Sequence, residues 1–121
     1  KLVDVYPPSA DYPEGYALNL VDGIVRARYR NDRSRPELLE PGAVYELTIV
    51  PYPTSNLFAA AHRIRVDISS SNFPRFDVNP NTGEPLGRNR RYQVADNTIH
   101  HDAARPSHIV LPLIPAEGGH P

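Results

Sequence analysis

The sequence predicts an all-β protein, a sandwich or barrel of short strands with at most one short helical turn. Fourteen prolines and seven glycines interrupt the 121 residues too often for long helices. Apolar and polar residues alternate in several short runs, which is the period-2 pattern of a strand with one buried face. These runs follow one another without helical segments between them, so a parallel sheet with crossover helices is not expected.

Length and composition narrow the class of protein. The length predicts a single domain, which we place at residues 1–115, followed by a frayed tail at 116–121. The lack of cysteine excludes disulfides and thiol chemistry and leaves the compartment open, with the cytoplasm favoured over the periplasm or secretion. A formal charge of −1 argues against nucleic acid or an anionic membrane as partner. No apolar run approaches the roughly 20 residues that span a bilayer, so we expect a soluble chain.

Two strands and a hairpin are predicted near the N-terminus. The first strand is Leu2–Tyr6, and the loop Pro7–Gly15 follows it. The runs Ala17–Val21 and Ile24–Arg30 flank Asp22-Gly23, a dipeptide that suits a tight two-residue turn. We therefore expect a hairpin whose second strand presents alternate arginines on one wet face.

The middle of the chain carries the two clearest strand patterns. Alternation is regular at 45–49 and again at 62–68, and we expect the second strand to be the one around which the sheet is organised. Between them, Leu57–Ala61 is long enough for one helical turn only. Residues 77–91 have no periodicity and predict the longest loop.

The last strands are predicted at 92–95, 98–101 and 107–114, with Asp96-Asn97 as a turn. Alternate apolar positions along the predicted strands define the expected core. Its members are Tyr45, Leu47, Ile49, Ile64, Val66, Ile68, Ile109 and Leu111.

The loop after the strand at 62–68 is the candidate interaction site. Pro74 stands between two phenylalanines there, and proline ends a strand because it lacks the backbone donor. Aromatic side chains on such a loop either tuck beneath their own sheet or present an apolar surface to a neighbour. The candidate interface residues are Asn72, Phe73, Pro74, Arg75 and Phe76.

Two other sets of residues have simpler interpretations. Ser69, Ser70 and Ser71 lack the flanking glycines of a nucleophile elbow, and we interpret them as the polar end of a strand. Arginines are concentrated at 26–35 and at 88–91. Acidic residues lie beside the first run, and no aromatic residue is placed among its arginines to stack on a base. We interpret the runs as a solvated or salt-bridging face.

Several blocks carry a resemblance to a known family. They are Leu2–Tyr6, Thr54-Ser55-Asn56, His62–Asp77, Asn79–Glu84 and Asn97–Asp102. In this order they resemble the C-terminal domain of X-Pro dipeptidyl-peptidase-type serine hydrolases, a group that includes cocaine esterase, α-amino acid ester hydrolase and glutaryl acylase. The similarity runs from Leu2 to Pro112. Where the family has Gly-His-Arg, this chain has Ala61-His62-Arg63, so the turn before that strand is expected to differ in detail.

The resemblance implies a jelly-roll-like β-sandwich. Because the chain begins with Lys1 and the family domain is longer on its N-terminal side, we expect a domain fragment that can lack its first strands. It also implies a catalytic triad in a separate α/β-hydrolase domain, so we assign no catalytic residue, cofactor or metal here. The chain alone is not expected to be an enzyme, whereas the parent is expected to be a serine hydrolase that cleaves an ester, an amide or a dipeptide ending in proline.

The same resemblance implies the partners. The first is the α/β-hydrolase domain, on which this domain would pack and whose active site it would help to shape. The second is another copy of the chain, paired through an exposed sheet edge.

Two alternatives of other classes stay open. A carbohydrate-binding β-sandwich module would need an exposed coplanar pair such as Tyr12 and Tyr16. A metal-dependent enzyme of the cupin type would need three or more His or carboxylate ligands at one point. His100 and His101 are adjacent in a predicted strand and so point to opposite faces, which argues against their sharing an ion.

Overall fold

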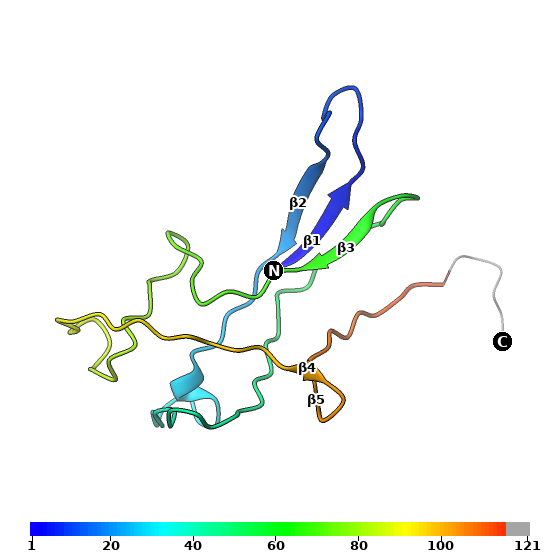
Figure 1. Cartoon of the computed structure of the whole chain (residues 1–121). Helices are drawn as coiled ribbons and strands as arrows, with labels where there is room; N and C mark the ends of the chain where they lie inside the picture. Colours follow the sequence, from blue (N-terminus) through cyan, green and yellow to red (C-terminus); the bar gives the residue numbers. More distant parts are fainter. Residues whose placement is uncertain (116–121) are drawn as a thin grey trace.

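The computed structural model describes residues 1–115 and confirms the all-β class (Figure 1). Strands β1 (Leu2–Tyr6), β2 (Tyr16–Val21) and β3 (Arg63–Val66) form an antiparallel sheet in the order β2-β1-β3. Strands β4 (His101–Asp102) and β5 (Arg105–Pro106) form a separate two-stranded ladder. In this part of the chain the helical structure is one 3₁₀ turn, η1 (Ala27–Tyr29), and no helix is long and apolar enough to cross a membrane.

The strand at the centre of the sheet is β1. Figure 1 shows it between β2 and β3, and its Leu2, Val3 and Asp4 are buried. The expectation that the strand at 62–68 organises the sheet is therefore wrong, because β3 lies at an edge and its four residues are all exposed. Beyond the ladder, the Lys1 amino group donates to the Asp67 carbonyl at 2.8 Å, and the Asp67 amide donates to the Lys1 carbonyl at 3.0 Å.

The predicted hairpin at Asp22-Gly23 does not form. Its first strand is present as β2, but the chain continues past Gly23 without a ladder and reaches η1. Gly23 is needed here for a close approach, since a Cβ at this position would lie 2.9 Å from Ile49 Cγ2 and 3.3 Å from the Pro51 Cα. The arginines at 26, 28 and 30 therefore do not share one strand face.

The predicted core is wrong for the residues the structure describes. Its aliphatic members from Leu47 to Ile109 are 40% to 56% exposed, and Tyr45 and Leu111 are half-buried. A strand buries an apolar face only when a second layer lies about 10 Å above it. Within residues 1–115 the sheet β2-β1-β3 has no second sheet packed on it, so the alternating apolar side chains stay at the surface.

Other predicted elements also lack partners. Residues 45–49, 92–95 and 107–114 run without a ladder, and 57–61 form no helix, because isolated extended segments and single helical turns need tertiary contacts to persist. The strand predicted at 98–101 is reduced to β4. Residues 77–91 form a loop as predicted. The predicted tail, 116–121, lies outside the described residues.

Candidate functional site

A buried carboxylate in the middle of β1 gathers two donors from a distant segment. Asp4 is fully buried, and its Oδ1 lies 2.9 Å from His62 Nδ1. Asn56 Nδ2 donates to Asp4 Oδ2 at 3.0 Å. An ionised carboxylate only accepts hydrogen bonds, so the His62 tautomer that satisfies this contact carries its proton on Nδ1. Asp4 therefore holds residues 56–62 against the sheet.

Aromatic rings cover this cluster at the end of β1. The Tyr6 ring lies 4.1 Å from the His62 ring and 6.0 Å, edge to face, from Tyr16. Tyr16 in turn contacts Tyr12 at 5.1 Å with an interplanar angle of 34°. Tyr12 and Tyr16 are both exposed, but they are tilted against each other and do not form the coplanar platform that the carbohydrate-binding alternative requires.

The Asp4–His62 pair matches two parts of a serine hydrolase triad, but the serines expected to be structural are engaged elsewhere. Ser69 Oγ donates to the Ser71 carbonyl at 2.7 Å, and Ser70 Oγ accepts from Asn97 Nδ2 at 3.0 Å. A nucleophile must lie within hydrogen-bond reach of its base. Ser69 and Ser70 therefore do not complete a triad with this pair, which links β1 to the residue that precedes β3.

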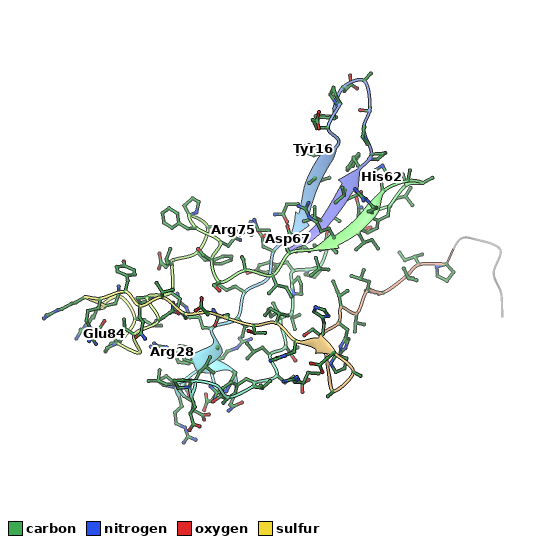
Figure 2. All side chains as sticks on the ribbon, in the orientation of Figure 1. Tyr16, Arg28, His62, Asp67, Arg75 and Glu84 are labelled. Atoms are coloured by element: carbon green, nitrogen blue, oxygen red, sulfur yellow. The ribbon has the colours of Figure 1, made fainter. Side chains whose placement is uncertain are left out.

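A second buried carboxylate, Asp22, follows the end of β2. Its side chain is 4% exposed, and its Oδ2 lies 3.2 Å from Arg75 Nη1. Asn19 Nδ2 donates to Asp22 Oδ1 at 3.2 Å, and Lys1 Nζ lies 4.0 Å from the same oxygen. Figure 2 shows Arg75 projecting from its loop near the base of the sheet. Asp22 thus joins β2 to the candidate interaction site.

The candidate interface residues occupy one turn, which we call the interface loop (Asn72–Phe76). The Phe76 amide donates to the Asn72 carbonyl at 3.1 Å and closes the turn, and the bond between Phe73 and Pro74 is cis. Phe73 is 70% exposed, whereas Phe76 is half-buried beneath the Arg75 guanidinium, 5.8 Å from its ring. One phenylalanine therefore faces solvent and the other lies against the domain.

The remaining charged residues make local contacts. Asp102 accepts from the backbone amides of Ala104 and Arg105, at 3.0 Å and 2.9 Å, and from Arg105 Nη2 at 2.8 Å. The Arg105 side chain, followed by these amides and the nearby His100, holds the pKa of Asp102 below its usual range. In residues 1–115 no three His, Asp or Glu side chains converge as a metal site.

The first basic run also makes local contacts. Arg30 donates to the carbonyls of Ala27 and Glu37 and lies 4.5 Å over the Tyr45 ring. Arg28 Nη1 donates to the Glu84 carbonyl at 3.1 Å. These contacts join the segment around η1 to its neighbours, so this run is not a free phosphate-binding stripe.

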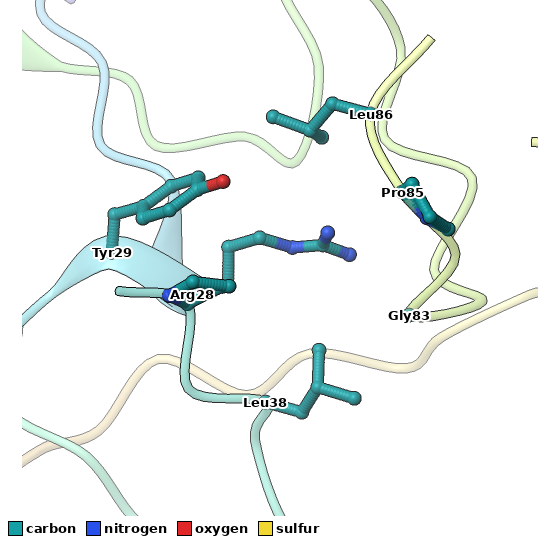
Figure 3. A pocket seen from close by; sticks show the side chains of 7 residues that line it. Arg28, Tyr29, Leu38, Gly83, Pro85 and Leu86 are labelled. Carbon is teal, nitrogen blue, oxygen red and sulfur yellow. The ribbon is translucent and has the colours of Figure 1, made fainter. Parts of the chain in front are cut away.

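A shallow pocket of about 400 Å³ lies where η1 meets the loop at 83–86. Figure 3 shows the Arg28 side chain crossing it, with Tyr29 and Leu86 on one side and Leu38 on the other. Its lining contains no carboxylate, histidine or serine side chain. Beside the pocket, the Glu84 carboxylate accepts hydrogen bonds from the Thr82 hydroxyl and from the Arg90 amide. These bonds lower the pKa of Glu84 and connect the residues of the loop. The pocket lies where the segment around η1 contacts the loop at 83–86, and its lining contains no acid–base pair.

The sequence predicted the interface loop as a candidate site, and this stays a prediction; it did not predict the two carboxylate clusters. The signal for Asp4 was present, because an aspartate interrupts the apolar run Leu2–Tyr6. Asn56 and His62 belong to blocks of the family resemblance, yet nothing in their spacing connects them with Asp4. The Asp22-Gly23 dipeptide predicts a turn, whereas the Asp22 carboxylate is buried against Arg75.

Comparison with known proteins identifies the family of this chain. The family model described as X-Pro dipeptidyl-peptidase C-terminal non-catalytic domain matches residues 1–110. The chain is 48% identical over 116 residues to cocaine esterase from Rhodococcus sp. (strain MB1 Bresler), which covers 94% of this chain and 19% of that protein. The chain thus spans about a fifth of its relative's length. No solved structure matches it. The chain belongs to the family of X-Pro dipeptidyl-peptidase C-terminal non-catalytic domains.

Proposed function

We propose that this domain packs on a separate α/β-hydrolase domain of the same polypeptide through the interface loop and helps to shape its active site. In this proposal the hydrolase domain carries the nucleophile, base and acid, and the parent cleaves an ester, an amide or a dipeptide ending in proline. The related cocaine esterase is named for esterase activity, which favours an ester as the first substrate to test.

The observation that carries the proposal is the exposure of Phe73. A phenylalanine that is 70% exposed at the tip of a closed turn leaves an apolar ring in water. Covering such a ring stabilises an interface by about 1.5–3 kcal/mol. Several aliphatic side chains expected to be buried, such as Ile64 and Ile109, are also exposed and support a larger covering surface.

The test uses the complete protein that contains this domain, with Phe73→Ser compared with Tyr92→Ser. Tyr92 is a matched control because it is also aromatic and is 76% exposed. We expect Phe73→Ser to lower kcat/KM on an aryl ester at least about threefold and to weaken cross-linking between the two domains, because an aromatic contact at the interface is lost. Equal kinetics and cross-linking in the two variants would contradict the proposal.

We also propose that an open sheet edge allows two copies of the chain to pair. In the part of the chain that the structure describes, the outer edges of β2 and β3 have no neighbouring strand. Unpaired backbone donors and acceptors favour pairing with another strand. Sedimentation of the complete protein should then give a dimer, and Ile64→Pro, which removes a donor from edge strand β3, should give a monomer. A wild-type monomer at all concentrations would refute this pairing.

A further inference from the structure

The buried carboxylate of Asp22, which follows β2, forms an ion pair with Arg75 of the interface loop. Among the ion pairs of residues 1–115, no other one involves a residue of this loop. The Asp22 carboxylate is almost fully removed from water, and a buried charge of this kind is tolerated only when opposite charge and hydrogen bonds compensate it. Arg75 supplies that charge at 3.2 Å, and Asn19 supplies a hydrogen bond. Lys1, at 4.0 Å, is more distant and more weakly held. The loop residue Arg75 is therefore the principal ionic partner of Asp22.

Arg75 connects Asp22 to Phe76, the half-buried phenylalanine of the loop. Its guanidinium contacts Asp22 on one side and lies 5.8 Å from the Phe76 ring on the other. Phe76 is thereby held at the domain, and the turn closed by the bond from the Phe76 amide to the Asn72 carbonyl leaves Phe73 outside. A fixed aromatic loses less conformational freedom on docking than a mobile one.

We propose that Asp22 is the positioning residue of the interface loop, and that the surface it positions fits an apolar, ring-sized socket on the hydrolase domain of the same polypeptide. This inference rests on the proposed function. A phenylalanine side chain buries only about 150–250 Å², far less than the roughly 800 Å² per partner of a stable complex between free proteins. A covalently linked domain needs much less, because the tether supplies a high effective concentration. The Phe73 ring is therefore too small to hold a free protein by itself, and a partner on the same chain fits this contact better, whatever area the exposed Ile64 and Ile109 add.

The experiment compares Asp22→Asn with Asp67→Asn in the complete protein. Asp67 is the matched control, because it pairs with Arg65 at 3.0 Å but both side chains are about half exposed. We expect amide hydrogen exchange at residues 72–76 to become at least about tenfold faster in Asp22→Asn, because the anchor of the loop is lost. The Asp67→Asn variant should leave exchange in the loop unchanged, because an exposed pair contributes little.

A double variant tests whether Asp22 acts through Phe73. If it does, Asp22→Asn lowers kcat/KM on an aryl ester, and adding it to Phe73→Ser lowers kcat/KM no further. Independent, additive losses would overturn the positioning role. Should Asp22→Asn fail to fold, Arg75→Gln and Arg75→Lys test the same pair from its exposed end. Lysine keeps the charge and should retain part of the loop's protection from exchange, which glutamine should not.

The outcomes separate this inference from the proposed function. Unchanged exchange at 72–76 in both Asp22→Asn and Arg75→Gln would overturn the inference, whatever Phe73→Ser does to activity. Faster exchange in the loop combined with normal activity and cross-linking in Phe73→Ser would overturn the proposed function, and with it the partner named here. Faster exchange with non-additive kinetic losses is the expected result.

Discussion

Asp4 and His62 are linked at 2.9 Å between the central strand β1 and the residue that precedes β3. The Asp4 side chain is 1% exposed and that of His62 is 13% exposed, so the contact is shielded from water. Tyr6, two residues after Asp4 on the same strand, contacts the imidazole with its ring tilted by 51°. Two residues of β1 therefore hold the His62 ring, Asp4 by a hydrogen bond and Tyr6 by an aromatic contact.

Asp4→Asn should weaken the attachment of β3 and residues 56–62 to β1. The substitution keeps the shape but removes the charge that strengthens both hydrogen bonds, and bonds to charged groups are worth about 1.5–3 kcal/mol each. We expect local stability to fall by roughly 2 kcal/mol, measured as faster amide exchange in 2–6 and 63–66. Asp11→Asn is the control, because Asp11 is exposed. Equal exchange in both variants would contradict a role for Asp4 in this attachment.

Ala61→Gly should stabilise the domain. Ala61 has a φ of 66°, a left-handed conformation that costs a residue with a Cβ about 1–2 kcal/mol. Glycine removes that cost but gives the unfolded chain extra freedom worth about 0.4–1 kcal/mol, so the net gain is roughly 0.5–1 kcal/mol. Thermal unfolding measures the change. The neighbouring Ala60→Gly has no such strain to relieve and should lower the melting temperature; a fall in both variants would show that the turn at Ala61 is unstrained.

The β4–β5 ladder should lose stability in acid. The pKa of Asp102 is lower in the folded state, mainly because Arg105 donates to its carboxylate. A lowered folded-state pKa stabilises the fold above the unfolded pKa, and that contribution is lost as the pH falls through the folded pKa. Amide protection at 101–106 should therefore decline below about pH 4.

Arg105→Gln tests the cause of this pH dependence. The variant should raise the Asp102 titration midpoint measured by NMR and move the loss of protection to higher pH. Asp32 is an internal control, because its pKa is lowered by bonds from Ser34 that do not involve Arg105. A midpoint for Asp102 that does not move would mean that the backbone amides alone set its pKa.

The isolated chain should not hydrolyse an aryl ester. Within residues 1–115 no hydrogen bond joins a serine to His62 of the buried Asp4–His62 pair, and no Gly-x-Ser-x-Gly elbow is present in the sequence. Hydrolysis followed by absorbance, with His62→Gln as the control, checks this. Turnover that His62→Gln abolishes would show that the chain itself is catalytic.

Local sequence patterns predicted the two strands nearest the N-terminus and the absence of long helices. Leu2–Tyr6 is β1 within its predicted bounds, and Ala17–Val21 lies within β2. Both runs are rich in β-branched or large apolar residues, and the two strands pair with each other. Residues 45–49 alternate between apolar and polar side chains but have no neighbouring strand to pair with, and alternation alone does not form a strand.

The candidate site was predictable in part. Pro74 and the two phenylalanines on either side of it are local signals, and they led to the candidate interface loop. The clusters around Asp4 and Asp22 depend on side chains that are far apart in the sequence and meet only in three dimensions. The role of Gly23 was not predictable for the same reason. The dipeptide Asp22-Gly23 predicts a turn, whereas the structure needs a glycine there because a Cβ would collide with the side chain of Ile49.

The pairing of Leu2 with Val66 has a consequence for biosynthesis. β1 and β2 are translated before β3, so one edge of β1 has no partner while residues 22–62, about a third of the domain, are still being made. Such delayed, non-local pairing slows folding and leaves an interval in which a chaperone or a neighbouring nascent chain can occupy that edge. Synonymous codons that slow translation between residues 22 and 62 should lengthen this interval and lower the soluble yield.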